Sequence, residues 1–396
     1  MSLLSYLSDK SVWIEYFEYK VKNEHLEGKQ VKELFRFIRN EEYIPILDKI
    51  LTTGFSIPTK KKIQKIGTTK KRVVYIFPKE ENDLLKLLTY LLIRKYDSIF
   101  YSNLYSFRAG YGVKDAFKRI LSIPNIENYF TYKVDISDYF NSIDLNILLP
   151  KLYELLKEDI ELYNLIEKLL SNPYVEEESV IKEEIKGVMA GSPIAAFLAN
   201  FYLREVDKSF ENDIYCRYSD DIILFAKTQE ELEEKKHKLL QLLEDHHLKI
   251  NTSKEVITHP HEQWTFLGLK YDAGNIDISD VSVKKLKDKM RRKSRALIRW
   301  SRNKNLESIN AVKSFINSFN KKLYNNTATH EMTWARWYFP LISTDKSLKI
   351  IDNYMQECIR YIATKKHTKS AYNFKYSKMK ELGYQSLVNN WYKHKN

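Results

Sequence analysis

The sequence predicts an α+β fold, and three observations carry that prediction. Strand-like segments end on acidic residues at two places, at Asp135 and at Asp220-Asp221. A third strand-like segment lies near Val256-Ile257, and two helices with recurring apolar residues are expected to cover the sheet. Beyond residue 275 the pattern is helical and strongly basic. We therefore expect an antiparallel sheet with covering helices, followed by an all-helical C-terminal region.

Apolar spacing and turn residues divide the rest of the chain into elements. The expected elements are a helical arm over the first 45 residues, a lysine-rich mobile loop at 58–69, a helix at 82–100, a helix pair or one long helix at 145–170, an acidic connector at 176–186, an amphipathic helix at 228–246 and a boundary turn at 272–275.

The segment Tyr218-Ser219-Asp220-Asp221 lies between the apolar runs 214–216 and 222–226. This pattern predicts a hairpin with two carboxylates at its tip. Adjacent carboxylates repel each other unless a cation lies between them. Together with Asp135 on a neighbouring strand, they can hold two divalent ions ~3.5–4 Å apart, which is an arrangement suited to phosphoryl transfer. For the Asp-Asp pair alone, a solvated turn is the simpler interpretation.

A glycine-containing block, residues 186–193, separates the two acidic sites. Gly187, Gly191 and the Ser192-Pro193 pair indicate tight backbone, and the apolar run 194–203 indicates that a helix follows. Glycines at such positions allow the main chain to approach a ligand closely.

The order of these blocks resembles reverse transcriptases. Residues 134–143, 187–203 and 218–221 resemble motifs A, B and C, the last as Y-x-D-D; residues 247–254 and 264–269 resemble motif D and the primer-grip hairpin, and residues 72–78 and 105–110 resemble fingers blocks. The resemblance covers about residues 60–272. It implies a right-hand polymerase with fingers, a split β-α-β palm with an RRM-like antiparallel sheet, and a helical basic thumb. The implied domains are an arm with fingers at 1–130, a palm at 131–272 with a fingers-like insertion near 145–190, and a thumb region at 273–396.

The resemblance also implies the catalytic centre of an RNA-directed DNA polymerase. Asp135 and Asp220 are expected to bridge two Mg²⁺ ions, with Mn²⁺ as an alternative, and the carbonyl of Ile136 to add a ligand. Asp221 is expected to bind more loosely or to orient its neighbour. Lys254 fits the motif D lysine, which donates a proton to departing pyrophosphate.

Five residues are expected to contact the incoming dNTP. Arg72, with Lys71 or Lys65 nearby, is the expected triphosphate clamp, against the alternative of a solvated basic loop. Phe140 stands at the position of the steric gate, which implies a preference for deoxynucleotides; palm core is an equal alternative. Gly187 follows Lys186, where many family members carry glutamine. A lysine there can bind sugar or phosphate but lacks an amide's paired donor and acceptor.

Nucleic-acid contacts are expected from three regions. Arg108 contacts the template backbone or braces the fingers. The remaining expected contacts are Gly191, Ser192, Pro193 and Tyr218 near the centre, Phe266, Leu267 and Gly268 in the primer grip, and Lys284, Lys287, Arg291, Arg292 and Arg295 on the basic helix.

Charge is distributed unevenly along the chain. The net charge is +13, but residues 281–396 carry 26 Lys+Arg against 7 Asp+Glu. The first 280 residues are therefore net acidic. A basic stripe beside a polymerase palm favours binding of duplex backbone phosphates, although a solvated basic helix is the plainer alternative.

Composition excludes several protein classes. The hydrophobic fraction of 43% and charged fraction of 30% are typical of a soluble globular protein. No segment reads as a signal peptide or a membrane span. Two cysteines are too few for a disulfide framework or a cysteine-based zinc site, so we expect a cytoplasmic protein.

Size and architecture resemble the free-standing prokaryotic reverse transcriptases of the retron, abortive-infection and phage-defence groups. The resemblance implies RNA template, DNA product, dNTPs and a cognate non-coding RNA as partners, antiviral defence as the role, and assembly into homo-oligomers. Two alternatives remain open: a template-independent or protein-primed DNA polymerase, and a non-catalytic RNA-binding scaffold.

Overall fold

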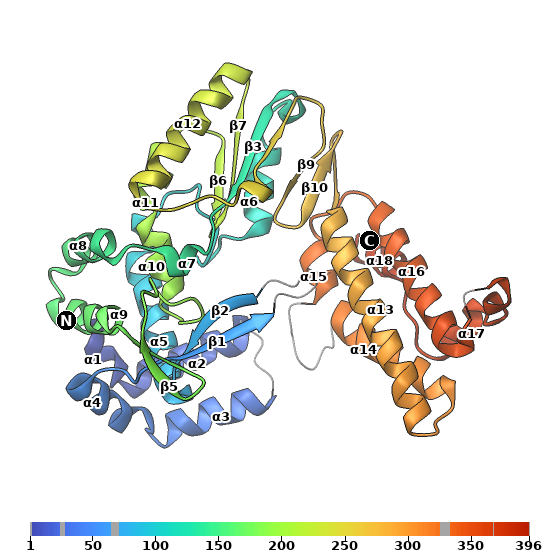
Figure 1. Ribbon diagram of the computed structural model, residues 1–396, viewed down its shortest axis with the longest axis horizontal. Coiled ribbons are helices and arrows are strands. Elements are labelled where there is room, and N and C mark those ends of the chain that lie inside the picture. Colours follow the sequence, from blue (N-terminus) through green and yellow to red (C-terminus); the bar gives the residue numbers. More distant parts are fainter. Residues whose placement is uncertain (1, 24–27, 65–70, 325–332, 367, 396) are drawn as a thin grey trace. The chain divides into compact units, whose positions relative to one another are not determined.

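The computed structural model describes residues 2–23, 28–64, 71–324, 333–366 and 368–395. These residues form two compact units, one up to residue 261 and one from residue 262 onward (Figure 1). Lys65 and the rest of 65–70 lie outside the described residues. Each unit is considered by itself.

The first unit begins with five helices, and three of them contact the long helix α5. The amphipathic spacing of α5 buries Leu84, Leu88 and Leu92, and α1, α2 and α4 contact it. Trp13 of α2 is fully buried and stacks on Tyr43 with ring centroids 4.9 Å apart. The helices are α1 (Leu3–Leu7), α2 (Lys10–Asn23), α3 (Gly28–Arg39), α4 (Tyr43–Thr53) and α5 (Lys79–Tyr96).

A four-stranded sheet in the order β2-β1-β4-β5 corrects two sequence-based predictions. Residues 59–64 of the predicted mobile loop form a strand, because they pair in antiparallel register with residues 71–76. The predicted acidic connector is a hairpin, whose turn residues Glu178 and Ser179 both have positive φ. The strands are β1 (Thr59–Gln64), β2 (Lys71–Ile76), β4 (Tyr174–Glu177) and β5 (Val180–Glu183).

The second sheet of this unit has the order β6-β7-β3-β8, and all its neighbouring strands are antiparallel. In chain order the four strands are β3, β6, β7 and β8, which gives the split β-α-β arrangement predicted from sequence. Helix α12 contacts both central strands (Figure 1). The elements are β3 (Phe130–Asp135), β6 (Tyr215–Tyr218), β7 (Asp221–Ala226), α12 (Gln229–Asp245) and β8 (Val256–Thr258).

Helices connect these strands, and of the two alternatives predicted for 145–170 the helix pair is the one found. The connecting helices are α6 (Val113–Leu121), α7 (Tyr139–Ser142), α8 (Leu145–Leu156), α9 (Ile160–Ser171), α10 (Ala195–Tyr202) and α11 (Arg204–Ser209), with 3₁₀ turns η1 (Asp97–Ile99), η2 (Ile126–Asn128) and η3 (Thr252–Lys254).

The second unit begins with a small sheet and continues as helices. The turn at Ala273-Gly274 joins two paired strands, so the strand that follows it was missed in the prediction of an entirely helical region. Helices α13, α14 and α16 contact one another and form its core. Its elements are β9 (Trp264–Phe266), β10 (Leu269–Asp272), β11 (Asn275–Ile278), α13 (Asp280–Asn303), α14 (Ser308–Leu323), α15 (Trp334–Tyr338), α16 (Lys346–Thr364), η4 (Lys369–Asn373), α17 (Tyr376–Glu381) and α18 (Leu387–Lys395).

The predicted fold class is confirmed: the chain has a mixed α+β polymerase-like fold with a C-terminal helical region. Among the described helices, none combines the length and the apolar character that crossing a membrane requires.

Candidate active site

Strand register brings the three acidic residues together. Asp135 at the end of β3 is the Cα partner of Asp221 at the start of β7. The tip of the β6–β7 hairpin turns through Ser219, whose φ is +59°. The amide of Ile136 then donates to the carbonyl of Asp220 at 3.0 Å. The main chain therefore holds residues 135, 220 and 221 at one edge of the sheet.

A pocket of about 220 Å³ opens at this edge. Two of the three acids and two cations of the other sheet line the same pocket. The lining includes Asp135, Ile136, Asp220, Lys254, Phe140, Lys71 and Arg72. Asp221 lies beside the pocket and does not line it. The structure thus brings the predicted acids, the predicted triphosphate clamp and the predicted gate to one place.

The carboxylates repel one another. Burial, followed by the charge of Asp135, raises the pKa of Asp220 above its ordinary value. Burial and the charge of Asp220 raise the pKa of Asp221 to about 6. Holding these groups ionised therefore costs free energy unless a cation is close to them.

Lys254 supplies one cation. Its ammonium nitrogen lies 2.5 Å from Oδ1 of Asp135. The short turn η3 holds it there, because the amide of Asn251 donates to the carbonyl of Asp135 at 2.7 Å. The side chain of Lys254 is half exposed, so it can move without unpacking the core.

The oxygen donors at this edge suit divalent metal ions. Asp135 and Asp220 line one pocket with Ile136, and oxygen donors are what Mg²⁺ prefers. A divalent cation would also relieve the repulsion between these carboxylates. Within the described ranges, however, no three acidic, histidine or cysteine side chains converge as a closed metal cage. Asp135, Asp220 and Ile136 therefore fit divalent ions whose remaining ligands come from a bound substrate.

Phe140 forms part of the pocket wall. Its half-buried ring packs edge to face against Phe107 with centroids 6.3 Å apart, and it contacts Tyr139 at 5.6 Å. The two interpretations of Phe140 are therefore compatible, since one side of the ring packs on protein and the residue also lines the pocket.

The glycines of the 187–191 block serve packing within this chain. A Cβ on Gly187 would lie 2.4 Å from the carbonyl oxygen of Phe140, and one on Gly191 would lie 3.2 Å from that of Tyr75. Both glycines also have positive φ. The close approach expected toward a ligand is, in this structure, an approach between backbone segments.

Lys186 is not placed as predicted. Its side chain is buried, and its ammonium group donates to the carbonyl of Asn172. Burial lowers its pKa. Lys186 does not line the pocket, because the carbonyl of Asn172 at the end of α9 provides it with an internal acceptor.

Arg108 likewise braces the protein. Its guanidinium pairs with Asp97 (Nε to Oδ1, 2.8 Å), donates to the carbonyl of Tyr101 at 2.7 Å, and stacks 3.9 Å over the ring of Tyr111. Of the two predicted roles, bracing the fingers is the one that this geometry supports.

The remaining predicted contacts near the hairpin differ in exposure. Ser192 is buried and its hydroxyl has no hydrogen-bond partner in the structure, while Pro193 and Tyr218 are half-buried. The unpartnered hydroxyl of Ser192 and the two partly accessible side chains are compatible with binding nucleic acid, which stays a prediction.

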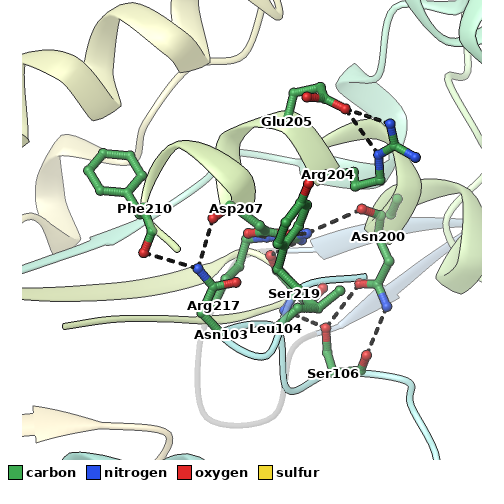
Figure 2. A network of polar contacts seen from close by, with 12 residues as sticks. Asn103, Leu104, Ser106, Asn200, Arg204, Glu205, Asp207, Phe210, Arg217 and Ser219 are labelled. Carbon is green, nitrogen blue, oxygen red and sulfur yellow. Dashed lines mark hydrogen bonds and ion pairs between the residues drawn. The ribbon is translucent and has the colours of Figure 1, made fainter. Parts of the chain in front are cut away.

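A buried ion pair behind the hairpin was missed in the sequence. Arg217 of β6 and Asp207 of α11 form this pair (Figure 2), and each side chain is at most 1% exposed. Arg217 also donates to the carbonyls of Asn200 and Ser219 at 3.2 and 3.4 Å. The hydroxyl of Ser106 accepts from the amide of Ser219 at 2.8 Å. An arginine inside an apolar strand is the signal that would have revealed this network.

In the second unit, the predicted primer-grip residues form a tight turn. Phe266 is fully buried, so its side chain is not available to nucleic acid. Leu267 and Gly268 both have positive φ and join β9 to β10. A Cβ on Gly268 would lie 3.1 Å from the hydroxyls of Ser282 and Tyr338, which shows that this turn packs against its own unit.

The predicted basic face lies on α13. Leu286, Met290 and Leu297 form the buried apolar face of this helix. Trp300 is 38% exposed and lies outside that face. Two of the cations have partners: Lys287 lies 4.6 Å from the ring of Tyr354, and Arg291 pairs with Asp288 at 2.8 Å. Lys284, Arg292 and Arg295 are exposed to solvent.

Known proteins give two kinds of similarity. The chain is 30% identical over 119 residues to the Putative COX1/OXI3 intron 2 protein of Saccharomyces cerevisiae, a match to 29% of this chain that spans 14% of that protein. Solved telomerase structures are similar at lower identity. One from Candida albicans, in complex with a fragment of telomeric RNA, has a TM-score of 0.45 at 14% identity and covers 89% of this chain and 71% of the other. An apo telomerase from Candida tropicalis has a TM-score of 0.47 at 13% identity and covers 83% and 68%.

The family match is more extensive. The profile of the family described as "Reverse transcriptase (RNA-dependent DNA polymerase)" matches residues 59–271, which include both sheets of the first unit and the whole acidic pocket. Because that match covers more than half of the chain, this protein belongs to the reverse transcriptase family.

Proposed function

We propose that this chain polymerises dNTPs into DNA on an RNA template. One observation carries the proposal: Asp135 of β3 and Asp220 of the β6–β7 hairpin share a pocket with Lys71 and Arg72 of β2. A site of this kind needs acids to hold metal ions and cations to hold a triphosphate, and both face the same space.

The side chains divide the work. Arg72 provides a fork of donors for phosphate oxygens, and Lys71 adds a mobile charge. Phe140 bounds the space beside the sugar. Asp135, Asp220 and the carbonyl of Ile136 would hold two Mg²⁺ ions, with Asp221 orienting Asp220. The chemistry that such ions supply is activation of the primer 3′ hydroxyl and neutralisation of the triphosphate.

Lys254 has two tasks in this proposal. Its ammonium balances the charge of Asp135. When it leaves that carboxylate, it can protonate the departing pyrophosphate, because a half-exposed side chain on a short turn has the freedom to move.

We further propose that the protein is a prokaryotic enzyme of the retron or phage-defence type. The order of its elements, a reverse transcriptase core followed by a basic helical unit, supports this. The same proposal includes a cognate non-coding RNA as template, a cytoplasmic location and assembly into homo-oligomers. The division into fingers up to residue 130, palm to 272 and thumb beyond is part of the same proposal. The basic face of α13 supports duplex binding by the thumb.

Purified protein tests the function directly. It is incubated with Mg²⁺ and dNTPs, singly and together, before and after RNase treatment. Extension that needs all four dNTPs and intact RNA supports the proposal. Extension after RNase treatment supports template-independent or protein-primed synthesis instead, and no incorporation with any divalent metal supports a binding scaffold. Sequencing the RNA that co-purifies identifies the template.

A further inference from the structure

The hairpin β4–β5 leaves one edge of its sheet open. β5 is the last strand in the order β2-β1-β4-β5, and among the described strands only β4 pairs with it. All four residues of β5 are exposed. An open edge can accept a further strand, because its outward main-chain groups are available for hydrogen bonds. We name residues 180–185 the β5 edge.

The register of the hairpin shows which main-chain groups point outward. The amide of Glu184 donates to the carbonyl of Pro173 at 2.9 Å, so the ladder between the two strands continues to this residue. In an antiparallel ladder, every second residue points its main-chain groups to the same side. The groups of Ile181, Glu183 and Ile185 therefore point away from β4. Within the part of the chain that the structure describes, these three amides donate to no acceptor.

The two faces of the β5 edge differ in character. Ile181 and Ile185 share one face by strand alternation and are 60% and 96% exposed. Lys182 and Glu184 lie on the other face, where each forms an ion pair with a residue of its own sheet. Natural edge strands are usually protected from association, and two exposed isoleucines do the opposite. The β5 edge is therefore suited to pairing with another strand.

The sequence of the β5 edge is complementary to itself. Two copies can run antiparallel with Glu183 opposite Glu183 of the second copy. Ile181 then faces Ile185, and Lys182 faces Glu184. Each of these contacts occurs twice, because a two-fold axis relates the copies. The two adjacent registers also place like charges on the axis, but they lack the apolar and the ionic pairs.

We propose that the β5 edge is a homodimer interface, at which two copies of this chain join their sheets by antiparallel pairing of residues 181–185. The inference rests on the proposed function only for the expectation of a homo-oligomer. Association is measured without dNTPs or metal, so its outcome is separate from that of the polymerisation experiment.

Main-chain pairing is tested at the two-fold axis. Analytical ultracentrifugation of nuclease-treated, full-length protein measures the dissociation constant of the dimer. Glu183→Pro removes both amides at the axis and should abolish the dimer. Glu183→Gln removes the like-charge contact at the same place and should tighten the dimer by about threefold. A protein that stays monomeric up to its solubility limit would overturn the proposal.

The apolar contacts are tested with a matched pair of variants. Ile185→Glu should weaken the dimer at least about tenfold, because both isoleucine pairs are lost. Leu51→Glu changes an apolar residue of α4 that is 49% exposed, and it should leave the dissociation constant unchanged. Melting temperatures check that each variant folds. An unchanged dissociation constant in Ile185→Glu would place the dimer interface elsewhere and overturn the proposal.

Oxidative crosslinking tests the register. Cysteines that replace Glu183 in both copies would have Cα atoms about 5.5 Å apart, which a disulfide can bridge. Glu183→Cys should therefore give a covalent dimer. Ser179→Cys should not, because this register places its two copies at opposite ends of the paired strands. The native Cys216 and Cys358 are buried and should not contribute. Equal crosslinking of the two variants, or none at Glu183→Cys, would contradict the proposed pairing.

Discussion

Arg217 and Asp207 form an ion pair with an Nη2–Oδ2 distance of 2.5 Å and at most 1% exposure of either side chain. The guanidinium spans from α11 to the carbonyl of Ser219, one residue before Asp220. The geometry of the acidic tip therefore depends on a charge pair that has no access to substrate.

Removing one partner of this pair should destabilise the protein. Arg217→Met leaves Asp207 buried without its cation, which costs about 3–5 kcal/mol. Arg217→Met/Asp207→Leu should recover most of that loss, as measured by chemical denaturation. Its polymerisation rate should stay low, because Ser219 and Asn200 still lack their donor. Full activity in the double variant would show that the pair does not position the tip.

Asp220→Ala should abolish nucleotide incorporation, with a loss of at least about a thousandfold, because a metal-binding carboxylate is worth several kcal/mol of transition-state stabilisation. Single-nucleotide extension measures the loss. Asp245→Ala, which removes an exposed acid from α12, is the control and should extend primers normally. Synthesis at the wild-type rate by Asp220→Ala would refute the proposed centre.

Asp221→Asn should raise thermal stability above pH 6 and not near pH 4. The pKa of Asp221 is about 6 in the folded protein and 3.8 ordinarily, so the folded state binds its proton more tightly than the unfolded state. Protonation thus favours folding below pH 3.8, and this contribution is lost as the pH rises through 6. The gain above pH 6 should be about 1–3 kcal/mol. Melting curves of both proteins from pH 4 to 8 check the sign, and an equal gain at every pH would contradict it.

Arg72→Ala should raise the KM for dNTPs by about ten- to a hundredfold, since a charge-assisted bond to phosphate is lost. Lys186→Met provides the contrast, because that ammonium is bonded to the carbonyl of Asn172 inside the protein. Its KM for dNTPs should change less than about twofold. Steady-state kinetics with one dNTP compare the two, and a large KM effect from Lys186→Met would restore the nucleotide contact first expected for it.

Phe140→Ala should increase the incorporation of ribonucleotides. Removing the ring enlarges the pocket beside Asp135 and Asp220 and makes room for a 2′ hydroxyl. The ratio of kcat/KM for dNTP over rNTP should therefore fall about tenfold or more. Phe35→Ala removes an exposed ring of the same type from α3, away from the acidic pocket, and should keep the ratio. An unchanged ratio in Phe140→Ala would leave Phe140 with a packing role alone.

The local sequence was sufficient to predict much of this architecture. Alternating apolar residues and turn signals specify β3, the β6–β7 hairpin and α12, because each depends on contacts within a few residues. The charge imbalance between the two parts of the chain is likewise a property of composition, and it predicted the basic helix α13.

Only tertiary structure decided what the polar side chains do. Lys186 was expected to bind sugar or phosphate, and Arg108 to contact the template backbone or to brace the fingers. Their acceptors lie at Asn172 and Asp97, which no local pattern connects to them. The parallel pairing of β1 with β4 and the hydrogen bond from the amide of Ser219 to Ser106 also depend on segments that are distant in sequence. A charged residue in the sequence does not by itself indicate a ligand-binding role. A buried charge needs a partner, and the fold determines whether that partner is a ligand or another residue of the chain.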